Sequence, residues 1–191
     1  MKRIMFFLII LSCIYISCTL KAFTQTAEHK IVSLPFEITV TEKEKLLLKE
    51  NGIIEFANKT FVYKEDGEKY PIRYNALITI YCKNNLCGLN IMEETGTSYT
   101  IIINIKAKKE IPYEKDPYFR FWDFFAIENY FILTSAEKAF AFNDSTGELL
   151  WTQTYQQRDG RKIIANKDHF IIDDVDGNRY RINKDGNKIK L

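Results

Sequence analysis

The sequence predicts an all-β fold built from about four small antiparallel sheets. Fourteen Phe and eleven Tyr accompany only eight Gly and four Pro in 191 residues, and large aromatic side chains favour the half-buried surfaces of pleated strands. Short apolar runs recur along the chain, separated by turns that contain Asp-Gly, Thr-Gly or Asn-Asn pairs. Such runs at this frequency are typical of antiparallel β-meanders.

Four units share one order of elements: an apolar strand, a polar turn, an alternating strand, a turn that ends in glycine, and a third strand. A turn glycine supplies the positive φ that closes a tight hairpin. Because a single hairpin sheet cannot bury its own faces, the units are expected to stack on one another. They span residues 53–73, 77–105, 131–154 and 170–191, and their glycines are Gly67, Gly96, Gly147 and Gly186.

Residues 125–155 combine an Asp144-Ser-Thr-Gly147 turn with a Leu150-Trp151 strand. This stretch resembles one blade repeat of the quinoprotein-like (PQQ-like) β-propeller superfamily. Residues 163–191 are similar to a weaker copy, without the Thr-Gly pair or the Trp. The resemblance implies a small β-propeller-like arrangement in which Trp151 packs between neighbouring blades. A partial propeller or an open β-meander is the alternative.

Three segments outside the units have their own expected structures. Residues 31–40, IVSLPFEITV, are a candidate strand to complete the last blade and close the ring. Without closure, the chain would be part of a larger propeller and would need a partner or a second copy. Residues 41–49 form either a short helix after a capping Thr or a strand extension. Residues 106–121 contain two Pro and mixed charge, which indicates a long loop.

The N-terminus indicates export. Lys2 and Arg3 precede an apolar run in the layout of a secretory signal, and a membrane span would need about 20 apolar residues. Cys18 follows a small residue at the place where a bacterial lipoprotein signal ends, so we expect a lipid on Cys18. Lipidation of Cys13 and plain secretion are the alternatives. The predicted organisation is a signal peptide at 1–17, a tether at 18–30 and a β-propeller-like domain at 31–191.

Charge argues against a nucleic-acid partner. Removal of residues 1–17 leaves 25 basic and 25 acidic residues, whereas nucleic-acid binders carry a clustered basic excess. The one dense basic run, residues 106–109, is followed at once by Glu110 and is expected to be a solvated loop.

Cys82 and Cys87 flank a four-residue turn between two apolar segments. A hairpin would place them opposite each other, and in an oxidising compartment a disulfide is expected. A metal site would need a second pair of ligands, which the chain lacks.

The chain carries few residues suited to chemistry. Its resemblance to the superfamily covers blade repeats and no cofactor-binding or catalytic motif. Neither a G-x-S-x-G nor an H-E-x-x-H pattern is present. Asp173, Asp174 and Asp176 are candidate Ca²⁺ ligands, because alternate carboxylates can converge on one cation. Asp-Gly-Asn is also a hairpin turn, which is the preferred interpretation, so we expect no catalytic residue, metal or cofactor.

These features favour an exported, lipid-anchored, non-enzymatic protein that binds or scaffolds proteins at a bacterial envelope. One propeller lipoprotein of the superfamily that this chain resembles uses the repeat for protein contacts alone. The alternatives are a small-ligand or Ca²⁺-binding propeller and a propeller fragment that forms an oligomer. Aromatic residues near the long loop are candidate partner contacts, or else buried strand residues; they are Tyr113, Tyr118, Phe119, Trp122, Phe124 and Phe125.

Overall fold

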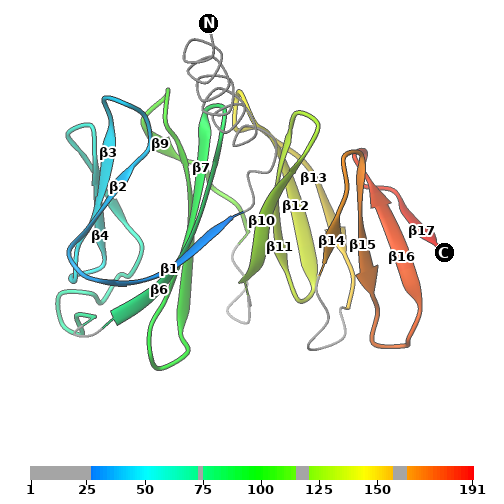
Figure 1. Cartoon of the computed structure of the whole chain (residues 1–191), viewed down its shortest axis with the longest axis horizontal. Helices are drawn as coiled ribbons and strands as arrows, with labels where there is room; N and C mark the ends of the chain where they lie inside the picture. The colour runs from blue at the N-terminus through cyan, green and yellow to red at the C-terminus, as the bar shows by residue number, and fades with distance from the viewer. Residues whose placement is uncertain (1–26, 73–74, 115–120, 157–162) are drawn as a thin grey trace, which may run out of the picture.

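The computed structural model describes residues 27–72, 75–114, 121–156 and 163–191. Within these ranges the regular structure is entirely β, with 17 strands in four antiparallel sheets (Figure 1). The predicted all-β class and the four sheets are confirmed. No helix in the described ranges has the length and apolar character needed to cross a membrane.

Apart from the first strand, which joins the second sheet, the sheets follow one another along the chain. The first contains β2 (Phe36–Thr39), β3 (Lys45–Leu48), β4 (Ile53–Phe56) and β5 (Lys59–Val62). The second, in spatial order, contains β1 (Glu28–Ser33), β6 (Asn75–Lys83), β7 (Leu86–Met92), β8 (Ser98–Asn104) and β9 (Lys109–Glu110). The third contains β10 (Phe121–Ile127), β11 (Tyr130–Ser135), β12 (Lys138–Asn143) and β13 (Leu149–Thr154). The fourth contains β14 (Ile164–Ala165), β15 (His169–Asp173), β16 (Arg179–Asn183) and β17 (Lys188–Lys190).

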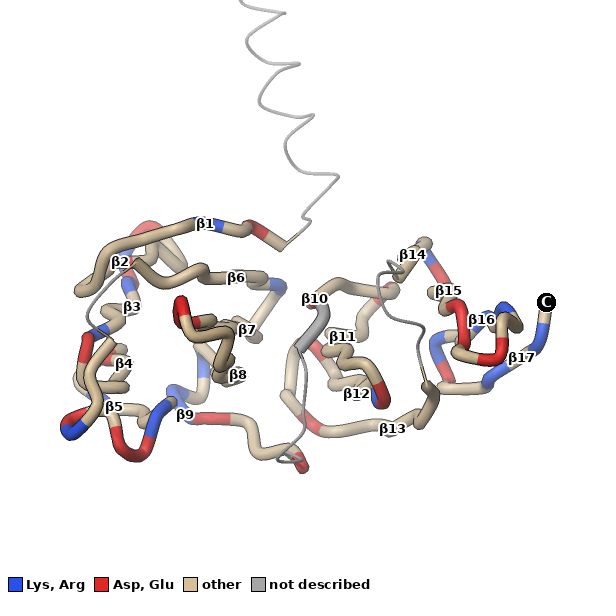
Figure 2. The backbone as a smooth tube through the Cα atoms, turned by 90° about the horizontal axis from the view of Figure 1, so that it is seen from below, with Lys and Arg blue, Asp and Glu red and all other residues tan. Residues whose placement is uncertain are grey.

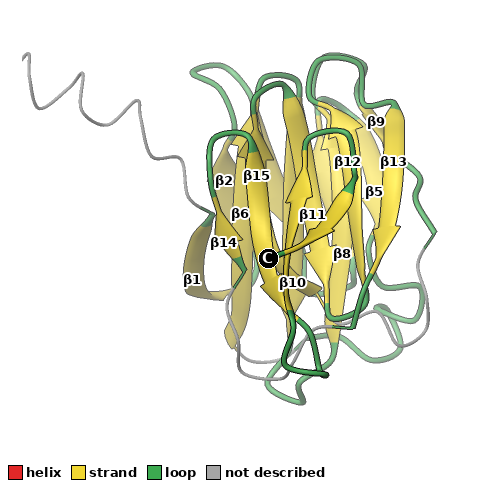
Figure 3. Ribbon diagram, turned by 90° about the vertical axis from the view of Figure 1, so that its right-hand side faces the viewer, coloured by secondary structure: helices red, strands yellow, loops and turns green. Residues whose placement is uncertain are grey.

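The four sheets stack face to face in an open row. Figure 2 shows them edge-on, with the first sheet at one end and the fourth sheet and C-terminus at the other. The view along the row shows the strands of all four sheets running in similar directions (Figure 3). Buried side chains form three clusters, one between each pair of neighbouring sheets. The described part of the chain therefore has the open arrangement, and the sheets do not close into a ring.

The expectation that residues 31–40 complete the last blade is wrong. β1 pairs with β6 in the second sheet, and β2 pairs with β3 in the first. Pro35, which has no N–H to donate to a ladder, separates these strands. Val32 and Ile38 are both buried in the cluster between the first two sheets. The segment therefore lies in the first two sheets, away from the fourth sheet at the other end of the row (Figure 1).

The first sheet differs from its predicted unit in two ways. Residues 68–72, the described part of the predicted third strand, do not form a strand, since the N–H groups of Lys69 and Tyr70 donate to the Asp66 carbonyl in a turn. Instead β3, from the segment 41–49, supplies strand pairing, so the strand alternative holds there. Leu46 and Leu48 are buried at 1% and 0% exposure, and this alternation selects the strand because one face must enter the core.

The glycine turns of the third and fourth sheets are similar but not identical: in each, an Asn side chain accepts two backbone N–H groups, and the second donor lies three residues after Asn143 but four after Asn183. Asn143 Oδ1 accepts the Ser145 and Thr146 N–H groups, both at 3.0 Å, and Gly147 has φ +79°. Asn183 Oδ1 accepts the Asp185 and Asn187 N–H groups at 3.1 and 2.9 Å, and Gly186 has φ +80°. At such φ values a glycine avoids the clash of a Cβ. The Thr-Gly stretch is thus a structural turn.

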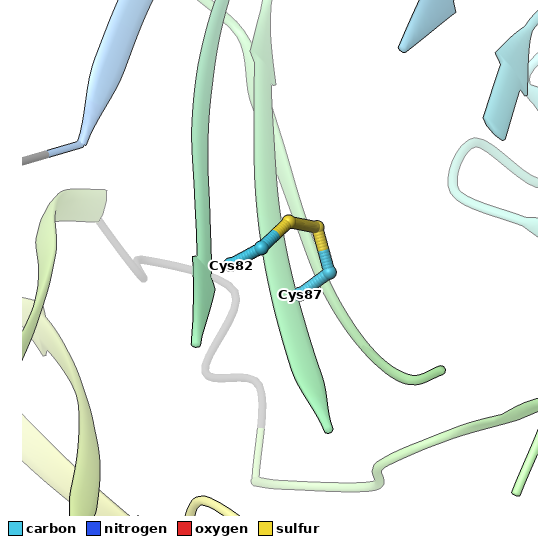
Figure 4. Close-up of a disulfide and its surroundings, with 2 residues drawn as sticks. All are labelled: Cys82 and Cys87. Carbon is cyan, nitrogen blue, oxygen red and sulfur yellow. A yellow bond between two sulfur atoms is a disulfide. The ribbon is translucent and has the colours of Figure 1, made fainter. Parts of the chain in front are cut away.

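Cys82 and Cys87 are register partners at the end of the β6–β7 hairpin. Their sulfurs are bonded, with the Cα atoms 4.0 Å apart (Figure 4). Cys87 is fully buried in the cluster between the first two sheets, and Cys82 packs partly against it.

Replacing both cysteines, Cys82→Ala with Cys87→Ala, is expected to lower the free energy of unfolding by about 2 kcal/mol, because a short closed loop constrains the unfolded chain. Urea denaturation of the oxidised wild type, the reduced wild type and the double variant measures this. The reduced wild type should match the variant. Equal stability of the oxidised and reduced wild type would contradict a structural disulfide.

Candidate interaction surface

Each sheet contacts the next through side chains that lie side by side across its strands. In the third sheet, a row of register partners points at the fourth sheet; it consists of Phe125, Ile132, Ala141 and Trp151. The ring centroids of Phe125 and Phe170 are 5.4 Å apart. Trp151 Nε1 donates to the Lys184 carbonyl at 2.6 Å. Trp151 is therefore an inter-sheet packing residue, as predicted.

The fourth sheet carries a row at the equivalent positions. Asn183 begins the glycine turn of the fourth sheet and is the register partner of His169. Two residues further into the sheet, Ile171 is the register partner of Arg181. Ile132 and Ala141 stand in the same relation to Asn143 in the third sheet. We call this row of the fourth sheet the terminal row; it consists of Ile164, Ile171, Arg181 and Ile189.

The terminal row faces solvent. Ile164 is 48% exposed and Ile189 is 42% exposed, while Ile171 is half-buried and Arg181 exposed. No sheet of the described part covers it, because the fourth sheet ends the row of sheets (Figure 1). Single exposed apolar residues are ordinary, but apolar side chains at positions that pack sheets elsewhere in the molecule make the terminal row a candidate interaction surface.

Polar side chains border the terminal row. On one side Arg179 Nε donates to Asp173 Oδ1 at 2.8 Å, and this bond raises the pKa of the Arg179 guanidinium. On the other side His169 Nδ1 lies 2.7 Å from Asp168 Oδ1. The surface thus has a centre of three isoleucines and Arg181 with a charged border, an arrangement similar to that of protein interfaces.

The open face of the first sheet, at the other end, is different. Its central register row contains Glu37, Leu47, Glu55 and Thr60. Lys45 Nζ lies 2.6 Å from Glu37 Oε1, and Lys49 pairs with Glu55. Repeat proteins need terminal units with a polar outer face. The central row of the first sheet carries two ion-paired carboxylates, although Val62 on the same face is 53% exposed. The central row of the fourth sheet carries three isoleucines and Arg181.

A buried ion pair joins the first two sheets. Lys64 Nζ lies 2.7 Å from Glu93 Oε1, with the side chains only 6% and 14% exposed. Burial acts to lower the pKa of Lys64, but its hydrogen bond and attraction to Glu93 outweigh this and raise the pKa. Lys64 Nζ also lies 5.6 Å from the centroid of the Tyr99 ring. The pair thus links the first two sheets through a buried contact between charged side chains.

The buried Asp144 ties the second and third sheets together. Lys83 Nζ lies 3.6 Å from its Oδ2 atom, and the Asn85 N–H donates to its carbonyl at 3.1 Å. Burial and the charge of Asp144 raise the pKa of the nearby Tyr81 to about 12. The Asp of the Asp-Ser-Thr-Gly stretch is thus a packing residue.

The candidate Ca²⁺ ligands do not gather around one point. Asp173 pairs with Arg179, while Asp174 Oδ2 lies 3.7 Å from Lys188 Nζ. The Gly177 N–H donates to the Asp174 carbonyl at 3.0 Å, which closes the expected turn next to Asp176. Within the described ranges, no three His, Cys, Asp or Glu side chains are placed to hold a metal ion.

The structure places several candidate contact residues in the core. Phe124 and Phe125 are only 1% and 9% exposed. The half-buried Tyr113 stacks edge-on against Phe140, with ring centroids 5.5 Å apart, and its hydroxyl donates to the Thr100 carbonyl. Burial raises the pKa of Tyr113. These three side chains hold sheets together and are not free for a partner.

Of the other predicted site residues, Trp122 belongs to β10. Tyr118, Phe119, Cys13 and Cys18 lie outside the described residues. Sequence analysis missed the terminal row. The signal that could have found it is the alignment of residues 164–189 with residues 125–151, where the packing positions of one unit become exposed positions in the other.

Comparisons with known proteins leave the family open. No protein-family profile matches the chain, and no curated protein matches it in sequence. Among solved structures, the crystal structure of BamB from Moraxella catarrhalis is similar over 80% of this chain and 45% of that chain, with 12% identity and a TM-score of 0.34. The chain thus spans less than half of that protein's length. A TM-score of this size does not establish a shared fold, so the sheet arrangement rests on the strand pairing described above.

Proposed function

We propose that this chain is an exported, non-enzymatic protein-binding or scaffold protein of the bacterial cell envelope. The observation that carries the proposal is the terminal row, three isoleucines and Arg181 on an open sheet face, at positions that pack against a neighbouring sheet elsewhere in the molecule. A protein surface that continues the stack would cover this row. The alternation of apolar centre and charged border suits a protein partner better than a small ligand, which binds in a concave pocket.

The signal-like N-terminus and the Cys82–Cys87 bond support the envelope as compartment, because disulfides persist in oxidising compartments. In this proposal Cys18 carries the lipid anchor. Cys18→Ala is expected to move the protein from the membrane fraction to the soluble periplasmic fraction. Mass spectrometry of the wild type should find a diacylglyceryl group on Cys18. An unprocessed N-terminus in the cytosol would overturn the compartment and the anchor together.

Binding is tested by affinity purification from solubilised envelopes, with quantitative mass spectrometry of what is retained. The wild type should retain one protein in near-stoichiometric amount, which can include a differently tagged copy of this chain. Ile171→Arg should lose it, because a second charge is forced into the apolar centre. Val62→Arg, on the open face of the first sheet, is the matched control and should retain it. Equal retention by all three would contradict a binding role for the terminal row.

A further inference from the structure

We infer that the partner at the terminal row is a second copy of this chain, whose fourth sheet packs against the first copy's fourth sheet about a two-fold axis parallel to the strands. This inference rests on the proposed function, because it names the occupant of the same surface. It starts from the difference between the central rows at the two ends: Glu37 and Glu55 are ion-paired in the central row of the first sheet, whereas the ion pair of the fourth sheet's outer face, Asp173–Arg179, borders a row that exposes Ile164 and Ile189.

Contact between the two fourth sheets is favoured over a head-to-tail stack. In a head-to-tail stack, the terminal row would bury the open face of the first sheet. Taking the ion pairs Lys45–Glu37 and Lys49–Glu55 out of water has a desolvation cost that can exceed their attraction. A head-to-tail contact that does not close also continues without limit. A two-fold contact is complete with two copies and leaves a polar first sheet at each outer end.

The register of the fourth sheet makes this face self-complementary. A two-fold axis parallel to the strands, between β15 and β16, reverses the strand order and keeps the height along the strands. Ile171 of one copy then lies opposite Arg181 of the other, whose aliphatic stem can cover it while the guanidinium reaches the rim. Ile164 lies opposite Ile189.

The charges bordering the row select this axis. Asp173 and Arg179 are register partners on β15 and β16. The axis therefore places Asp173 of each copy opposite Arg179 of the other, so that four charges alternate in sign. A two-fold axis across the strands would instead place β16 on β16 and Arg181 on Arg181, and two like charges in contact oppose binding.

The contact is small. Four strands about 4.8 Å apart, the longest of five residues, make a face about 15–20 Å in each direction. Two such faces bury on the order of 600 Å² in total, which is below the roughly 1,200 Å² of stable specific interfaces and in the range of weak, transient contacts. We therefore expect a reversible dimer with a dissociation constant in the micromolar range. Anchoring of both copies in one membrane would raise their effective concentration.

The experiment places a photo-reactive amino acid at position 171 of the full-length chain in intact cells that express two copies with different epitope tags. Illumination should give a product of twice the chain mass that carries both tags. The same residue at position 47, on the open face of the first sheet, should give none. By sedimentation velocity of the detergent-solubilised full chain, Ile171→Arg should raise the dimer dissociation constant at least about tenfold, and Leu47→Arg should not change it.

Each other outcome is decisive. A product between position 171 and a different protein would overturn the second-copy inference and leave the binding function standing. A two-tag product from position 47 would replace it with the head-to-tail stack. No product at position 171, with a monomer at every concentration in sedimentation, would overturn both the inference and the role of the terminal row.

Discussion

Phe140→Ala is expected to lower the free energy of unfolding by about 4 kcal/mol, because a large buried side chain loses its transfer energy and leaves a cavity. Phe140 lies on β12 with only 1% of its surface exposed. It belongs to the cluster that joins the second and third sheets, together with Tyr81 and Phe131. Each sheet buries its faces only against its neighbours, so this cavity weakens the joint between two halves of the row.

Urea denaturation followed by circular dichroism measures the effect. Leu150→Ala is the matched control, since it removes an apolar side chain of the same sheet that is 42% exposed; a surface change of this kind is expected to cost about 0.5 kcal/mol. Similar losses for the two variants would mean that the second and third sheets do not pack as described.

Lys64→Met is expected to cost about 3 kcal/mol, because removal of one partner leaves Glu93 buried without its counter-charge. A double variant, Lys64→Met with Glu93→Gln, should recover a large part of this loss. The matched control is Lys45→Met, which breaks the exposed pair with Glu37 and should cost no more than about 1 kcal/mol. Equal losses at Lys64 and Lys45 would contradict a buried pair between the first two sheets.

The same pair predicts a dependence of stability on pH. The pKa of Lys64 is raised in the folded protein. The stabilisation is therefore fully present below the pKa of an unfolded lysine, about 10.4, and is lost as the pH rises through the higher folded value. Above about pH 10.4 the unfolding free energy of the wild type should fall more steeply than that of Lys64→Met. Parallel curves for the two proteins would contradict the raised pKa.

The local elements of the fold could be predicted from the sequence because their causes are local. In β12 the large Phe140 and Phe142 alternate with the small Ala139 and Ala141, so each kind of side chain lies on its own face of the strand, and both faces are buried. Gly147 and Gly186 take the positive φ that their turns need. The opposition of Cys82 and Cys87 follows from the length of their turn. Strand period and turn chemistry act over a few residues, so they are legible without knowledge of the rest of the chain.

The sequence also indicated the packing role of Trp151 and the preference for a turn at Asp176. It did not predict that β1 pairs with β6, or that residues 68–72 form no strand. Both outcomes depend on which sheet edges and buried faces lie next to these segments in the folded chain. The same holds for the Lys64–Glu93 pair, whose members belong to different sheets and are 29 residues apart.

The sequence by itself determined the number of sheets, the glycine turns and most strands of the second, third and fourth sheets, because hydrophobic alternation and backbone conformation are properties of short segments. Only the tertiary structure decided that the row stays open and that Ile164, Ile171 and Ile189 lie on its uncovered face. A side chain at an inter-sheet position has the same local pattern whether or not a further sheet follows. Its exposure depends on what lies beyond the last sheet, which no short segment of the chain encodes.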